Sequence, residues 1–166
     1  YKDVHSVSLT GGEPLLSVEF LKEFLPLVNK KIYLETNATL SEKFLEIKPF
    51  VDIVSADIKL ESATGIKNSY KFHDKFFEAC QGVETFAKIV FNSQITDEEI
   101  AKCCNLGGKY GIELVLQPEM GFNKTLEHPD FMKVNSEFCA KILDKFLANY
   151  SNVRLIPQVH KFLDVR

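Results

Sequence analysis

Two patterns of apolar residues alternate along the chain. The first short apolar run, Val4 to Leu9, stops at two glycines, and the apolar residues that follow recur every three or four positions. Runs of the first kind predict strands, and the second spacing predicts helices. Because the alternation returns along the whole chain, we expect six strands with helices between them. The expected strands are 4–9, 31–34, 51–60, 85–91, 112–117 and 153–156.

Capping signals indicate where the expected helices begin and end. Ser17 can cap the first helix, and Pro49 ends the second. Thr96 and Glu99 have the spacing of a capping box, and the glycines from Gly107 onward are expected to terminate that helix.

Two polar segments, 61–69 and 118–129, are expected to be loops. The second leads to a helix on which Phe138, Ile142 and Phe146 fall on one apolar stripe. Helices that alternate with strands in this way favour an α/β fold with a parallel sheet and helices outside. We expect a single domain, 1–166, built as a partial (β/α)6-type barrel, with a doubly wound sheet as the alternative.

Composition narrows the function classes. Apolar residues make up 45% and charged residues 26%, and no window is apolar enough to span a membrane. A net charge of -3 argues against a broad nucleic-acid surface, so a small molecule or another protein is the expected partner. The four cysteines lack the spacing of a disulfide or zinc framework, which favours structural thiols, buried or on the surface, and a cytoplasmic location.

The chain begins with Tyr1 and enters a strand within a few residues. We therefore expect a domain truncated at its N-terminus. An open sheet edge there could pair with a second copy, so a dimer of the fragment would not prove a biological dimer. A homodimer is kept as one possible partner arrangement.

The most informative stretch follows the first expected strand. Gly11 and Gly12 can adopt positive φ and bring backbone N–H groups close to a ligand. Pro14 suits a first helical turn, and Glu13 is left near the strand end with a carboxylate expected to be free to accept from an amine.

Polar residues also close the other strands. Because the carboxyl ends of parallel strands meet at one rim, these side chains are expected to converge there. Acids on this rim could bind an amine and ribose hydroxyls. The alternative without a function is that these residues are polar because their loops face solvent, and that Asp57 and Lys59 only form an ion pair. The residues concerned are Glu35, Asn37, Asp57, Lys59, Gln117, Gln158 and His160.

Three of these segments resemble the radical S-adenosylmethionine (SAM) enzymes. Thr10 to Pro14 resembles the Gly-Gly-Glu motif that holds the methionine amino group of SAM. The segments Glu35-Thr36-Asn37 and Asp57-Ile58-Lys59 resemble the next two motifs, which face SAM in that family. The resemblance implies that a set of residues from these segments, together with Gln117, binds the cofactor: Gly11, Gly12, Glu13, Glu35, Asn37, Asp57 and Lys59.

The C-terminal part is similar to the 7-carboxy-7-deazaguanine synthases, which close on a Pro-Gln-x-His segment. That resemblance implies a radical ring contraction of 6-carboxytetrahydropterin, a small-molecule substrate, in queuosine biosynthesis. It also implies a [4Fe-4S] cluster, Mg2+ assistance and an electron donor such as flavodoxin or ferredoxin. Gln158 and His160 are placed near the substrate, and no catalytic residue is assigned.

Two departures keep alternatives open. The three-cysteine cluster motif is absent, and the adjacent Cys103 and Cys104 cannot replace it, so we expect the cluster ligands upstream of Tyr1 and an inactive fragment. The segment Ala56 to Gly65 looks more like the glycyl-radical activating enzymes. An activating enzyme and a non-catalytic SAM-binding scaffold are therefore the alternatives.

Overall fold

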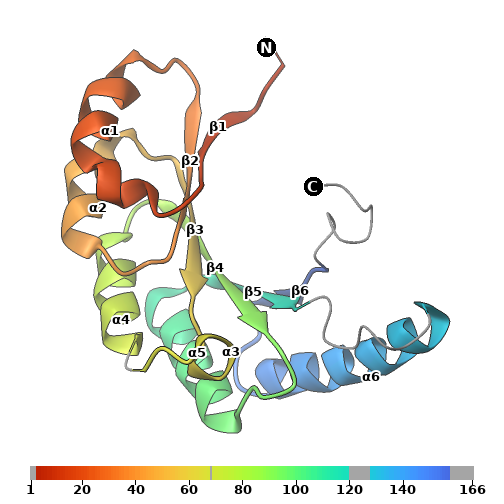
Figure 1. Cartoon of the computed structure of the whole chain (residues 1–166). Helices are drawn as coiled ribbons and strands as arrows, with labels where there is room; N and C mark the ends of the chain where they lie inside the picture. Colours follow the sequence, from red (N-terminus) through yellow and green to blue (C-terminus); the bar gives the residue numbers. More distant parts are fainter. Residues whose placement is uncertain (1–2, 68, 120–127, 158–166) are drawn as a thin grey trace.

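The fold is one curved parallel sheet with helices packed along it (Figure 1). The computed structural model describes residues 3–67, 69–119 and 128–157. All six expected strands form. Their bounds are β1 Ser6–Leu9, β2 Lys31–Thr36, β3 Ile53–Ile58, β4 Glu84–Phe91, β5 Glu113–Pro118 and β6 Val153–Leu155.

The strand order is β1-β2-β3-β4-β5-β6, and each strand pairs in parallel with the next along the chain. A doubly wound sheet reverses its strand order at a switch point, and this sheet has no reversal. The α/β prediction with a barrel-type parallel sheet is therefore confirmed, and the doubly wound alternative is wrong.

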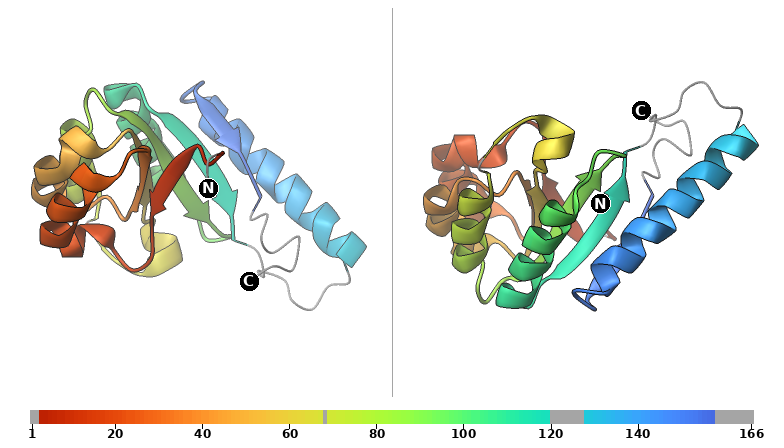
Figure 2. Two further views of the ribbon diagram at one scale, coloured as in Figure 1. Left: turned by 90° about the horizontal axis from the view of Figure 1, so that it is seen from above. Right: turned by 90° about the horizontal axis from the view of Figure 1, so that it is seen from below.

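The helices connect successive strands and pack against one another in chain order. Neighbours α1 and α2, α2 and α4, α4 and α5, and α5 and α6 are in contact. Figure 2 shows α1, α2 and α4 side by side. The helical bounds are η1 Pro14–Ser17, α1 Val18–Phe24, η2 Leu25–Leu27, α2 Ser41–Ile47, η3 Lys48–Phe50, α3 Glu61–Thr64, α4 Tyr70–Ala79, α5 Asp97–Tyr110 and α6 His128–Leu147.

Three boundaries differ from the sequence predictions. The expected loop 61–69 contains α3, whose end is capped by Gly65 at φ 72°. Gly107 lies inside α5, which instead ends at Gly111 in the left-handed region. A Cβ at Gly107 would lie 2.8 Å from the Tyr150 ring, so this glycine serves packing. Helix α6 begins at His128, within the second expected loop.

The core lies between the sheet and its helices. β3 is buried almost throughout, as expected of a central parallel strand. Phe44 of α2 and Phe76 of α4 are fully buried, with ring centroids 5.1 Å apart. All four cysteines are free and buried. Among the described residues, no helix combines the length and apolarity that a membrane crossing needs.

Candidate functional site

A cavity of about 250 Å3 lies at the carboxyl ends of β1 to β4. Alternate residues of a strand share one face, so the lining residues of β3 are Ser55, Asp57 and Lys59. The strand register then places Glu35 beside Ser55, and Lys88 beside Asp57. The complete lining is Thr10, Gly11, Gly12, Glu35, Thr36, Asn37, Ser55, Asp57, Lys59 and Lys88.

The turn after β1 forms one wall of this cavity. Gly11 and Gly12 have φ values of 88° and 52°, a backbone region that residues with a Cβ rarely adopt. The expected positive φ at the paired glycines is therefore confirmed. No heavy atom lies within 4 Å of an ideal Cβ at either position, so backbone conformation and not crowding requires glycine here.

Glu13 differs from the sequence prediction, because its carboxylate is already bonded. Its Oε1 accepts from Thr36 Oγ1 at 2.8 Å and from the Leu15 N–H at 3.1 Å. Its Oε2 accepts from the Asn37 N–H at 2.8 Å. Glu13 does not belong to the cavity lining. The physical reason is that Glu13 precedes Pro14 as the N-cap of η1, so its side chain reaches across to the end of β2.

Asp57 forms the charged centre of the cavity. Its Oδ2 lies 2.5 Å from Lys59 Nζ, and its Oδ1 lies 3.7 Å from Lys88 Nζ. The Oδ1 atom is buried and has no hydrogen-bond partner among the described residues. The ion pair that the sequence suggested is therefore present, with a second lysine added by β4. An orphaned carboxylate oxygen of this kind is satisfied when a ligand donates an N–H or O–H to it.

Glu35 and Asn37 bring the end of β2 into the same cavity. Glu35 Oε2 accepts a long hydrogen bond of 3.4 Å from Thr10 Oγ1. Asn37 Oδ1 accepts from the N–H and hydroxyl of Thr39, at 3.1 and 2.6 Å. The Asn37 side chain thus folds the turn after β2, and Glu35 keeps most of its acceptor capacity.

None of the three predicted site residues in the C-terminal part is found among the described residues that line the cavity, for two different reasons. Gln117 lies on β5 in register with Val90, and it is outside the cavity lining. Gln158 and His160 lie outside the described residues. Their placement near a substrate therefore stays a prediction.

Three residues at this site, Ser55, Lys88 and His73, were missed by the sequence reasoning. Lys88 falls within the expected strand 85–91 but was not among the predicted site residues, although its spacing of two from Phe86 and Val90 places all three on one face of that strand. His73 was not singled out. It is fully buried on α4, and its ring lies between Ala38 and the Lys59 N–H. His73 lies three and four positions before Phe76 and Phe77, a helical spacing that indicates a buried position. That spacing does not indicate which groups the ring would contact.

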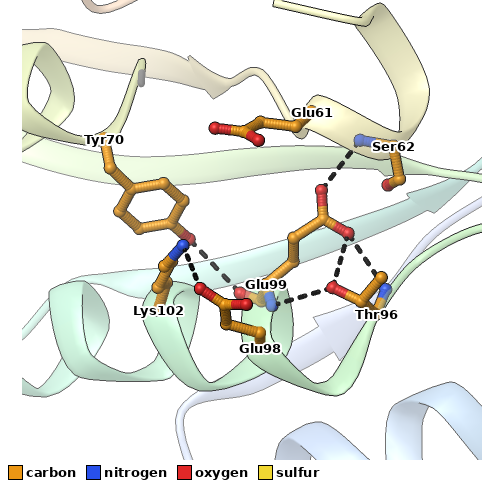
Figure 3. Close-up of a pocket in the computed structure, with 7 residues that line it drawn as sticks. All are labelled: Glu61, Ser62, Tyr70, Thr96, Glu98, Glu99 and Lys102. Atoms are coloured by element: carbon orange, nitrogen blue, oxygen red, sulfur yellow. Dashed lines mark hydrogen bonds and ion pairs between the residues drawn. The ribbon is translucent and has the colours of Figure 1, made fainter. Parts of the chain in front are cut away.

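A second cavity of about 250 Å3 lies between α3, α4 and the start of α5 (Figure 3). Glu99 closes its inner side: one carboxylate oxygen accepts from the Ser62 N–H at 2.9 Å, and the other from the N–H of Thr96. Burial alone would raise the pKa of the Glu99 carboxyl. The hydrogen bonds from Ser62 and Thr96 together outweigh burial, so the net pKa lies below its usual value. The expected capping box is confirmed, and it also holds α3, which follows Lys59.

Comparison with known proteins identifies relatives across nearly the whole chain. The chain is 33% identical to the 7-carboxy-7-deazaguanine synthase of Geobacter sulfurreducens, over 95% of this chain and 62% of the relative. It is also 33% identical to the enzyme of that name from Archaeoglobus fulgidus, over 98% and 68%. The 7-carboxy-7-deazaguanine synthase of Methanopyrus kandleri is 32% identical, over 96% and 60%. The chain thus spans about two thirds of the length of these relatives.

A solved structure supports the fold. The crystal structure of archaeal TYW1 superposes with a TM-score of 0.59 at 17% identity, covering 89% of this chain and 50% of that one. No protein-family profile matches the chain. The identities, the strand order and the converging motif segments lead to one conclusion: the chain belongs to the 7-carboxy-7-deazaguanine synthase family of radical SAM enzymes.

Proposed function

We propose that the protein containing this chain is a 7-carboxy-7-deazaguanine synthase, and that the cavity at the ends of β1 to β4 binds its SAM. One observation carries the assignment of the cavity. Residues of the three segments that resemble SAM-facing motifs, Thr10 to Gly12, Glu35 to Asn37, and Asp57 with Lys59, come together around a single 250 Å3 space. The activity is the radical ring contraction of 6-carboxytetrahydropterin that the family resemblance implies.

The charges of the cavity suit this cofactor. Two carboxylates, Glu35 and Asp57, face two ammonium groups, Lys59 and Lys88. SAM carries an amino group, a sulfonium and a carboxylate, so it needs both signs. The orphaned Asp57 Oδ1 can accept from the amino group, and Lys88 can hold the carboxylate. The open turn at Gly11 and Gly12 lets the backbone approach the ligand.

This chain contributes orientation and exclusion of water, whereas SAM and the cluster supply the one-electron chemistry. Glu13 fixes the Thr36–Asn37 turn, which places Asn37 beside the ligand space. Glu35 is left to accept from ribose hydroxyls. Gln117, Gln158 and His160 remain assigned to the cofactor or substrate by resemblance.

The described residues do not fit the [4Fe-4S] cluster. No group of three His, Cys, Asp or Glu within them could hold a metal ion. Cys103 and Cys104 are adjacent residues of a helix and are both buried. We therefore assign no cluster ligand to this chain. Mg2+ assistance and a flavodoxin or ferredoxin as electron donor are parts of the proposal that rest on the family resemblance.

The test uses the full-length protein, reconstituted anaerobically with iron and sulfide. It is incubated with SAM, dithionite and 6-carboxytetrahydropterin, and the products are identified by mass. We expect 7-carboxy-7-deazaguanine from the native protein, and a large loss in Asp57→Asn. The matched control is Asp74→Asn, which removes an exposed ion pair with Lys109 outside the cavity and should leave turnover intact.

The outcomes separate the alternatives. SAM cleavage without the product would overturn the substrate assignment and favour an activating enzyme. No SAM binding would overturn the cavity assignment, and binding without cleavage would favour a non-catalytic scaffold.

A further inference from the structure

The first turn of α4 holds the backbone of Lys59 on both sides. The Ser69 hydroxyl donates to the Lys59 carbonyl at 3.0 Å. The Lys59 N–H donates to Nε2 of His73 at 3.3 Å. Lys59 lines the SAM cavity, and both its backbone N–H and its carbonyl are hydrogen-bonded to residues at the start of α4. These two bonds fix the position of the Lys59 backbone and so the point from which its side chain extends.

The other nitrogen of the same ring holds the turn after β2. His73 Nδ1 lies 3.1 Å from the carbonyl oxygen of Ala38. Ala38 directly follows Asn37, is fully buried, and has φ 55°, a strained value for a residue with a Cβ. The contact with His73 is one of the interactions that hold this conformation in place, together with the bond from the Ala38 N–H to Thr36 Oγ1.

These two partners determine the tautomer. A carbonyl oxygen can only accept, so Nδ1 must carry the proton, and the Lys59 N–H can only donate, so Nε2 must be bare. A doubly protonated ring would set an N–H against the Lys59 N–H. The geometry therefore requires a neutral ring with its proton on Nδ1.

The surroundings favour that neutral form. His73 is completely buried, and burial lowers its pKa. The charged groups that act on it come from the end of β3: Asp57 favours the charged ring, and Lys59 disfavours it. On its own helix the Tyr70 ring lies edge-on, with centroids 6.2 Å apart.

We propose that His73 is a positioning residue that joins the Asn37–Ala38 turn to Lys59 and thereby sets the spacing of two walls of the SAM cavity. It acts through these backbones and touches neither SAM nor substrate. The identity of the ligand rests on the proposed function, whereas the coupling of the two strand ends does not.

The experiment uses the full-length protein and three variants. His73→Asn places an amide nitrogen near the position of Nδ1 and keeps the donor to Ala38, but it loses the acceptor for Lys59. His73→Gln reaches the position of Nε2 and keeps that acceptor, but it loses the donor. Phe77→Leu is the matched control, because Phe77 is fully buried on α4 and belongs to the apolar core.

Hydrogen–deuterium exchange measures the coupling without SAM. We expect faster exchange at 57–60 in His73→Asn, faster exchange at 36–39 in His73→Gln, and neither segment-specific change in Phe77→Leu. Nitrogen-15 NMR of the ring should show protonated Nδ1 and bare Nε2. SAM affinity, measured by titration, should fall about tenfold in both histidine variants, since each loses one buried hydrogen bond.

Each result decides a separate claim. A ring protonated on Nε2, or one common exchange pattern in all three variants, overturns the coupling. Histidine variants that bind SAM as tightly as Phe77→Leu overturn the positioning role. A native protein that does not bind SAM overturns the proposed function, while the exchange pattern still decides the coupling.

Discussion

Glu13 Oε2 accepts a 2.8 Å hydrogen bond from the backbone N–H of Asn37, so the turn after β1 is fastened to the turn after β2. The two residues lie on consecutive strand ends of a parallel sheet, and the same carboxylate also accepts from Thr36 Oγ1. One acid thus shapes a rim of the cavity without lining it.

This relationship predicts the effect of Glu13→Gln. The amide keeps one acceptor oxygen but replaces the other with a donor, which faces groups that also donate. We expect the free energy of unfolding to fall by about 1 to 3 kcal/mol, the cost of losing hydrogen bonds to a charged group. Urea unfolding measures it. Glu35→Gln is the control, since Glu35 accepts one 3.4 Å bond, and an equal loss in both variants would contradict the prediction.

We predict that Lys88 contributes to the affinity for SAM. Its ammonium lies at the cavity, 3.7 Å from Asp57 Oδ1, and about a quarter of its side chain is exposed. Replacing it with methionine should weaken SAM binding by about fivefold, because a partly exposed charge contact contributes roughly 1 kcal/mol. The control is Lys145→Met, which loses an exposed ion pair with Asp97, and neither of these residues lines the cavity. Unchanged affinity in Lys88→Met would remove Lys88 from the site.

We predict that replacing a glycine with alanine has opposite effects on the free energy of unfolding at Gly11 and at Gly108. Gly11 has φ 88°, so Gly11→Ala should lower the free energy of unfolding by about 1 to 2 kcal/mol through backbone strain. Gly108 lies on α5 with open space at its Cβ position, so Gly108→Ala should raise it by about 0.5 to 1 kcal/mol. Thermal or urea unfolding of both variants gives the signs. A shift in the same direction would show that the turn after β1 is not constrained as described.

The buried His73 predicts a pH dependence of stability. Its pKa is lowered in the folded state, chiefly by burial, whereas the unfolded chain titrates near 6.5. The unfolded chain therefore binds the proton first. Stability that is fully present above about pH 6.5 is lost as the pH falls toward the lowered folded pKa, by at most about 1.4 kcal/mol per pH unit.

Urea unfolding of the native protein and His73→Asn between pH 5 and 7.5 measures this effect. The stability difference between them should be constant above neutral pH and shrink below about pH 6.5. Parallel curves across the range would mean that His73 titrates alike in both states.

Much of the fold follows from local patterns in the sequence. Alternation within strands, capping residues and the Gly11–Gly12 turn involve neighbours a few positions apart, and all six strands and the capping box form where these patterns predict them. The polar residues at strand ends converge because a parallel sheet brings its carboxyl ends to one rim. Local glycine signals failed at Gly107, because packing against Tyr150 outweighs helix propensity.

By itself, the sequence determined the α/β order, the segments that line the cavity and the family they resemble. Only the tertiary structure decided the partners of individual atoms: that Lys88 stands beside Asp57, that Glu13 holds Asn37, and that His73 joins Ala38 to Lys59. Each of these contacts joins residues 14 to 35 positions apart. Such contacts depend on strand register and helix docking, which the whole core sets by packing and which no short stretch of sequence contains.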